Sequence, residues 1–168
     1  MNPAWIIRSE STFMQKNVPL FLQRFFITCF KEDSCIEYFI NKPASTDTVS
    51  SSLVFCYNAM AKDLHVSRFH PELYLQANSK YLSAACFYLL IHHCANTFSL
   101  DDTCRISLET VPKVCEDFYS RLGDFKFQIH KNGLGNVVEL SSDLVRLPVD
   151  TSMIKTHVFG ESEIPFLK

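Results

Sequence analysis

Glycine is scarce in this sequence, and neither sign of charge is in clear excess. The 168 residues include 4 glycines against 15 phenylalanines, which is the composition of a globular chain with a large aromatic core and argues against disorder. The formal net charge is -2, and no run of lysine and arginine forms a basic patch. We therefore expect no nucleic-acid partner, because nothing here would attract a phosphate backbone over a distance.

Long apolar runs are also missing. The longest, Ala84 to Ile91, is far shorter than the ~20 residues that a membrane-spanning helix needs. The first ten residues lack the charged segment and long apolar segment of a secretory signal. These absences predict a cytoplasmic protein that does not enter the membrane.

The cysteines lack the spacing of a metal or disulfide framework. Their number is odd, no CxxC pair occurs, and most lie in apolar segments; they are residues 29, 35, 56, 86, 94, 104 and 115. We interpret them as reduced thiols that act as small hydrophobic side chains in a cytosol-like compartment. His92 and His93 are adjacent on a predicted helix, so their side chains point about 100° apart and no metal site is expected.

The length is that of one domain, which we place over residues 1–168. Apolar and polar periodicity predicts a strand at 4–8, a helix at 16–33, and strands at 51–58, 62–69 and 71–78. Residues 35–41 fit either a helix or an extended segment. Further on we predict a helix at 80–98, a strand at 104–111, a helix from Pro112 to Gly123, and a hairpin between 125–131 and 136–142 with its turn at Asn132-Gly133.

This order predicts an α/β fold. The segments 71–78, 80–98 and 104–111 form a strand, helix, strand crossover, so we expect the strands 71–78 and 104–111 to be parallel.

The segment ISLETVPKVCEDFYSRLGDFKF, residues 106–127, resembles the C-terminal half of the GCN5-related N-acetyltransferases. The features shared are a strand, a short helix that ends in the pair Phe118-Tyr119, then Gly123 and Phe125 before the next strand. Element order and length agree along the chain, and the motif match covers Lys80 to about Phe127. The resemblance implies a mixed, mostly antiparallel twisted sheet with a central parallel strand pair and helices on both faces.

The family's acetyl-CoA pyrophosphate turn falls on Lys80, Tyr81, Leu82, Ser83, Ala84 and Ala85 at the start of the predicted helix. Helix N-terminal N–H groups bind phosphate when small side chains let it approach. In this chain Ser83 and Ala85 stand where the family has glycine.

The resemblance implies an N-acetyltransferase that moves an acetyl group from acetyl-CoA to a primary amine by direct attack, without a metal. Tyr119 would lie at the cofactor sulfur as the general acid. Backbone amides of Leu75, Gln76 and Ala77 would bind the cofactor and polarise its carbonyl. Candidates for the general base are Glu109 and Glu72, followed by His70.

Two alternatives stay open. The chain is a catalytically inactive binding or protein-interaction module of the same fold, as the missing glycines and Pro112 in place of the family's usual asparagine suggest, or it is an unrelated α/β domain. The acceptor amine is unidentified, and the phenylalanine-rich residues 20–40 would suit a homodimer interface.

Overall fold

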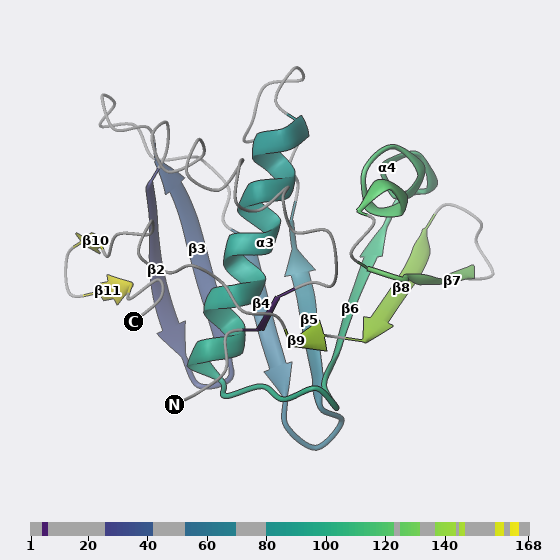
Figure 1. Ribbon diagram of the computed structural model, residues 1–168. Helices are drawn as coiled ribbons and strands as arrows, with labels where there is room; N and C mark the ends of the chain where they lie inside the picture. The colour runs from purple at the N-terminus through teal and green to yellow at the C-terminus, as the bar shows by residue number, and fades with distance from the viewer. Residues whose placement is uncertain are drawn as a thin grey trace.

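A single mixed sheet dominates the computed structural model, which describes residues 5–6, 26–41, 53–69, 80–122, 125–131, 137–143, 145–146, 157–159 and 162–164. Seven strands lie in the order β2-β3-β4-β5-β6-β8-β7 (Figure 1). Their bounds are β2 Phe26–Glu32, β3 Cys35–Asn41, β4 Leu53–Asn58, β5 Asp63–Arg68, β6 Arg105–Thr110, β7 Gln128–Lys131 and β8 Val138–Asp143.

All neighbouring strands of this sheet are antiparallel except β5 and β6, which are parallel. The helix α3 (Lys80–Thr97) connects these two strands, because a parallel pair needs a crossover. The short helix α4 (Pro112–Asp117) and a single 3-10 turn, Tyr119–Arg121, follow β6. The N-terminus of α3 and the helix α4 consequently lie at the end of the sheet to which β5 and β6 point (Figure 1).

Alternation along the strands divides the sheet into a core face and an open face. On β5 and β6 the apolar residues, such as Val66 and Ile106, are buried beneath α3. The residues between them, such as His65 and Ser107, point the other way and are partly exposed. In the part of the chain that is described, α3 and α4 both pack on the core face.

The helix α3 is buried on every side from Leu82 to Ala95. It ends in a left-handed residue, Ser99 (φ 52°), and the N–H of Leu100 donates to the carbonyl of Ala95 across 2.9 Å. The strand β1 (Trp5–Ile6), which pairs with β9 (Val145–Arg146), also contacts α3. Two further short strands, β10 (His157–Phe159) and β11 (Ser162–Ile164), pair with each other.

Most of the predicted elements are confirmed. The strands at 51–58, 62–69 and 104–111, the helix at 80–98 and the helix that begins at Pro112 correspond to β4, β5, β6, α3 and α4. The hairpin is confirmed as β7 and β8, with Lys131 opposite Val138. Its turn at Asn132-Gly133 and the helix stop at Gly123 lie outside the described residues.

The predicted helix at 16–33 is wrong for its second half. Phe26–Glu32 is the strand β2, and its partner is the segment 35–41, which is extended. The turn Asp33-Ser34 joins the two, and Asp33 adopts φ 52°, a region that aspartate tolerates better than most residues do. The apolar spacing was therefore compatible with a helix, but pairing across the sheet determines the structure.

The parallel pair lies elsewhere than predicted. The two neighbours of β6 are β5 and β8, so the parallel partner of 105–110 is 63–68 and not 71–78. The segment 71–78 itself is outside the described residues. The predicted strand, helix, strand crossover through α3 is confirmed, but its first strand is β5 and not 71–78.

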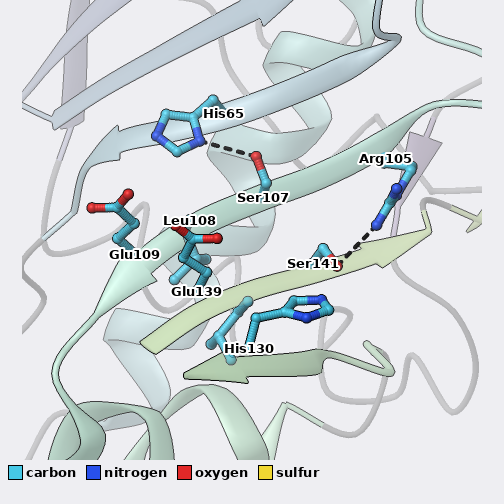
Figure 2. A pocket seen from close by; sticks show the side chains of 9 residues that line it. His65, Arg105, Ser107, Leu108, Glu109, His130, Glu139 and Ser141 are labelled. Carbon is cyan, nitrogen blue, oxygen red and sulfur yellow. Dashed lines mark hydrogen bonds between the residues drawn. The ribbon is translucent and has the colours of Figure 1, made fainter. Parts of the chain in front are cut away.

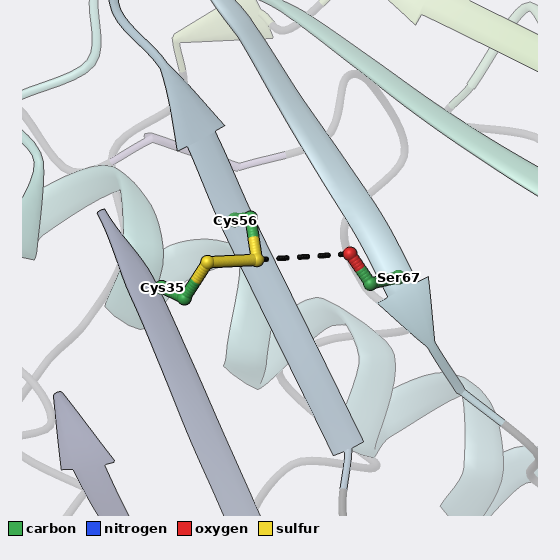
Figure 3. The surroundings of a disulfide bond; sticks show 3 residues. All are labelled: Cys35, Cys56 and Ser67. Carbon is green, nitrogen blue, oxygen red and sulfur yellow. Dashed lines mark hydrogen bonds between the residues drawn. A yellow bond between two sulfur atoms is a disulfide. The ribbon is translucent and has the colours of Figure 1, made fainter. Parts of the chain in front are cut away.

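Cys35 and Cys56 form a disulfide, which corrects the prediction that all seven thiols are reduced (Figure 3). The two residues are directly opposite on β3 and β4. Five other cysteines are free and buried. The disulfide weakens the argument from reduced thiols for a cytoplasmic location, which stays a prediction.

None of the described helices is long and apolar enough to cross a membrane.

Candidate functional site

The predicted phosphate turn forms the start of α3. Lys80 and Tyr81 are its first two residues, and the side chains of Leu82, Ser83, Ala84 and Ala85 are buried in its first turns. The first N–H groups of any helix lack partners within the helix, and helix N-termini are for this reason common anion-binding sites. The predicted contacts from Glu72, Leu75, Gln76 and Ala77, and the alternative base His70, lie outside the described residues.

Tyr119 is 3% exposed and belongs to an aromatic cluster on the core face. Its ring centroid lies 5.0 Å from that of Phe118, 5.7 Å from Phe87 of α3 and 5.9 Å from Phe127, each with edge-to-face geometry. The structure thus brings Tyr119 against the helix that carries residues 80–85, although about 35 residues separate them in the sequence.

The backbone opens between β5 and β6 at the same end of the sheet. Their ladder runs from Asp63 opposite Arg105 to Val66 opposite Leu108 and stops there, but β5 continues to Arg68 and β6 to Thr110. The two strands diverge beyond that point (Figure 1). Among the described residues, Arg68 pairs with Val54 of β4, and Glu109 and Thr110 pair with Glu139 and Val138 of β8, so the ladder between β5 and β6 itself ends at Val66 and Leu108.

The open face beside this opening carries a pocket of about 330 Å³ (Figure 2). That volume is at the lower end of the range for small-molecule sites. It is lined by His65, Arg105, Ser107, Leu108, Glu109, His130, Glu139, Leu140 and Ser141. Most of these side chains are polar or titratable, so the pocket suits a polar ligand.

A chain of hydrogen bonds joins two of these lining residues, His65 and Ser107, to Asp63 of β5, which lies outside the lining. His65 Nδ1 lies 2.9 Å from Ser107 Oγ, and Ser107 Oγ lies 2.6 Å from Asp63 Oδ2. A carboxylate only accepts hydrogen bonds and a hydroxyl has one hydrogen, so Ser107 donates to Asp63. His65 Nδ1 must then carry a hydrogen and donate it to Ser107. This tautomer leaves the lone pair on Nε2.

Two carboxylates occupy the other side of the pocket. Glu109 of β6 is directly opposite Glu139 of β8, and His130 of β7 is opposite Glu139 in turn. No described residue forms an ion pair or hydrogen bond with either glutamate. The nearby guanidinium of Arg105 instead donates to Ser141 Oγ across 2.9 Å. Like charges at directly opposed positions destabilise a sheet. A cationic ligand would offset the repulsion between the two glutamates.

The histidines and cysteines of α3 belong to the core. Tyr38 Oη lies 2.6 Å from His93 Nδ1 and 3.2 Å from Cys94 Sγ, and Asn96 Nδ2 lies 3.1 Å from His92 Nε2. Burial raises the pKa of the Cys94 thiol to about 12, so it is no nucleophile at neutral pH. Within the described ranges no three His, Cys, Asp or Glu side chains are placed to bind a metal ion.

Sequence reasoning identified Glu109 but missed His65, Ser107 and Glu139. Each alternates with buried apolar residues on its strand, which was enough to assign it to the open face. The sequence pattern does not show that β5 pairs with β6 and β6 with β8, and it predicts 71–78 as the neighbour of 104–111 instead.

Comparison of the chain with protein-family models, with curated proteins and with solved structures finds no match.

Proposed function

We propose that this chain is an N-acetyltransferase that moves an acetyl group from acetyl-CoA to a primary amine by direct attack, with an arrangement similar to that of the GCN5-related N-acetyltransferases. The observation that carries the proposal is the opening of the ladder beyond Val66 and Leu108, beside the N-terminus of α3 and Tyr119. Three features that acyl transfer from a CoA thioester needs would then meet at one end of the sheet.

The first feature is a binding edge for the pantetheine arm. Among the described residues β5 and β6 do not pair with each other beyond Val66 and Leu108. The arm contains amides, so it would lie between the diverging strands and pair with them as an added strand does. Amide N–H groups of β5 would also polarise the thioester carbonyl. This assigns to the end of β5 the role predicted for Leu75, Gln76 and Ala77.

The second feature is an anion site for the pyrophosphate. The N-terminus of α3 points to this end of the sheet, and Ser83 and Ala85 are small residues in its first turns. N–H groups and the helix dipole together favour phosphate there.

The third feature is a proton donor for the departing thiolate. Tyr119 packs against Phe87 of α3 on the core face, and the neighbouring Phe118 stacks on Phe69, the residue that follows β5. Its phenol would donate a proton to the sulfur when the C–S bond breaks.

A second candidate function is that of a binding module without catalysis. The observation that favours it is the burial of Tyr119, since a general acid must reach the substrate. Such a module would bind acetyl-CoA or CoA without turning it over.

Tyr119→Phe separates the two functions. It removes only the hydroxyl and keeps the ring contacts to Phe87, Phe118 and Phe127. We expect kcat for acetyl transfer to fall at least about tenfold, which is below the usual effect of general acid catalysis because a thiolate is a good leaving group. The Kd of acetyl-CoA should change less than about threefold by calorimetry. An unchanged kcat would remove Tyr119 from this role, and binding by the wild type without turnover would favour the module.

A further inference from the structure

We propose that His65 is the general base that takes the proton from the acceptor amine, with Ser107 and Asp63 as its positioning residues. The inference rests on the proposed function and names the acceptor side of its site. None of the three was a candidate from the sequence, where Glu109, Glu72 and His70 were considered.

The location of His65 supports this role. His65 is opposite Ser107 in the ladder, one position before its last pair, Val66 and Leu108. It lines the pocket on the open face, whereas Tyr119 packs on the core face. An acetyl group held in the opening would therefore have the base on one side of the sheet and the acid on the other.

The hydrogen-bond chain prepares His65 for this step. Ser107 donates its only hydroxyl hydrogen to Asp63, so it can only accept from His65. His65 therefore carries its hydrogen on Nδ1 and its lone pair on Nε2. When Nε2 takes a proton, the ring becomes an imidazolium whose Nδ1–H still donates to Ser107. The Asp63 carboxylate stabilises that positive charge through the serine hydroxyl.

Glu109 is less suited to be the base than His65. Its side chain is exposed, and no described residue orients it. Together with Glu139 it instead favours a cation, so the class of acceptor that fits the pocket is a small aliphatic primary amine, which arrives as an ammonium ion.

His65 Nε2 takes one proton from the bound ammonium ion and releases it to water, which leaves a neutral amine. The amine nitrogen then attacks the thioester carbonyl carbon, and once the C–N bond has formed the nitrogen loses a second proton to water. The C–S bond breaks, sulfur leaves with the electron pair, and Tyr119 protonates it. Water reprotonates Tyr119, so the products are the amide, CoA thiol and one released proton.

The first test reads the tautomer without any activity. Imidazole nitrogen chemical shifts of the wild-type protein at neutral pH should show His65 protonated on Nδ1 and not on Nε2. Ser107→Ala should convert the ring to mainly the Nε2–H form, because its Nδ1–H then has no acceptor. A wild-type His65 protonated on Nε2 overturns the inference.

The second test uses acetyl-CoA with n-butylamine as the acceptor. His65→Gln is expected to lower kcat about 100-fold and to leave the Kd of acetyl-CoA within about threefold. The deficit should shrink towards about pH 9.5, because the free-amine fraction then rises without a base; a merely structural role would not produce that pH profile.

The outcomes separate the two proposals. A wild type that neither binds acetyl-CoA nor acetylates the amine overturns the proposed function and this inference with it. A wild type that turns over, while His65→Gln keeps its kcat or loses it equally at every pH, overturns only the role of His65.

Discussion

Replacing Phe87 by alanine is expected to lower the free energy of unfolding by about 3 to 5 kcal/mol, the usual cost of emptying a buried phenylalanine site. Phe87 is fully buried, and its ring lies 6.4 Å or less from the rings of Phe55, Phe69, Phe118 and Phe125. Phe55 belongs to β4, Phe69 directly follows β5, and Phe118 and Phe125 lie before and after Tyr119. The substitution would therefore remove ring contacts that join α3 to both the sheet and the α4 region. Denaturant unfolding measures it directly.

Phe30→Ala is the matched control. Phe30 is 48% exposed, and among the described residues its ring has one aromatic neighbour, Phe39, at 5.8 Å. We expect a loss below about 1.5 kcal/mol, since only part of the side chain is buried and one aromatic pair is removed. Equal losses for the two variants would contradict the core described above.

Acidification from neutral pH to about pH 4 is expected to cost about 3 kcal/mol of stability through His93 alone, at about 1.4 kcal/mol per pKa unit. Burial, with a smaller contribution from the charge of His92, lowers the pKa of His93 from 6.5 to about 4. Between these values the unfolded state binds the proton and the folded state does not, so stability falls as the pH falls through this window. Above pH 6.5 both states are neutral and the effect vanishes.

His93→Gln supplies the control for that pH dependence. Glutamine does not titrate and offers an amide to the hydroxyl of Tyr38, which bonds His93 Nδ1 in the wild type. The variant is less stable at neutral pH because its packing changes, but its stability should vary much less between pH 6.5 and 4. The same slope in both proteins would show that other groups cause it.

The strand β2 shows why local pattern was insufficient for part of the fold. Phe26, Cys29 and Phe30 have the spacing of a helix face, yet Ile27 and Cys29 alternate as in a strand and are buried. Apolar periodicity over a short segment is compatible with both, and the antiparallel partner β3 decides between them. The strand β3 could not be assigned from the sequence, because the pattern of residues 35–41 is compatible with both a helix and an extended segment.

Elements with strong local signals were predictable. The helix α3 is long and apolar, α4 begins at a proline, and β6 alternates regularly around Ile106 and Leu108. Strand pairing depends on residues far apart in the sequence. The sequence pattern therefore predicted 71–78, and not β5, as the parallel partner of β6. For the same reason the opposed positions of Cys35 and Cys56 did not follow from their spacing.

The residues of the candidate site were likewise predictable where local sequence order was sufficient and unpredictable where strand pairing was needed. Tyr119, Ser83 and Ala85 were identified by their order along the chain, and Tyr119 does contact the helix that carries the other two. His65 and Ser107 required knowledge of which strands are neighbours and in which register. A polar residue between two buried ones was visible in each strand, but the hydrogen bond between them was not.

Titration of the protein with acetyl-CoA, followed by hydrogen exchange, tests the central claim most directly. We predict saturable binding with a Kd below about 1 mM and slower exchange of the amides at Ser67–Arg68 and Glu109–Thr110, which lie beyond the last pair of the β5–β6 ladder. The amides of the distant hairpin β2–β3 should exchange at unchanged rates. No binding at millimolar acetyl-CoA, or protection confined to other parts of the chain, would contradict a cofactor site in the opening between β5 and β6.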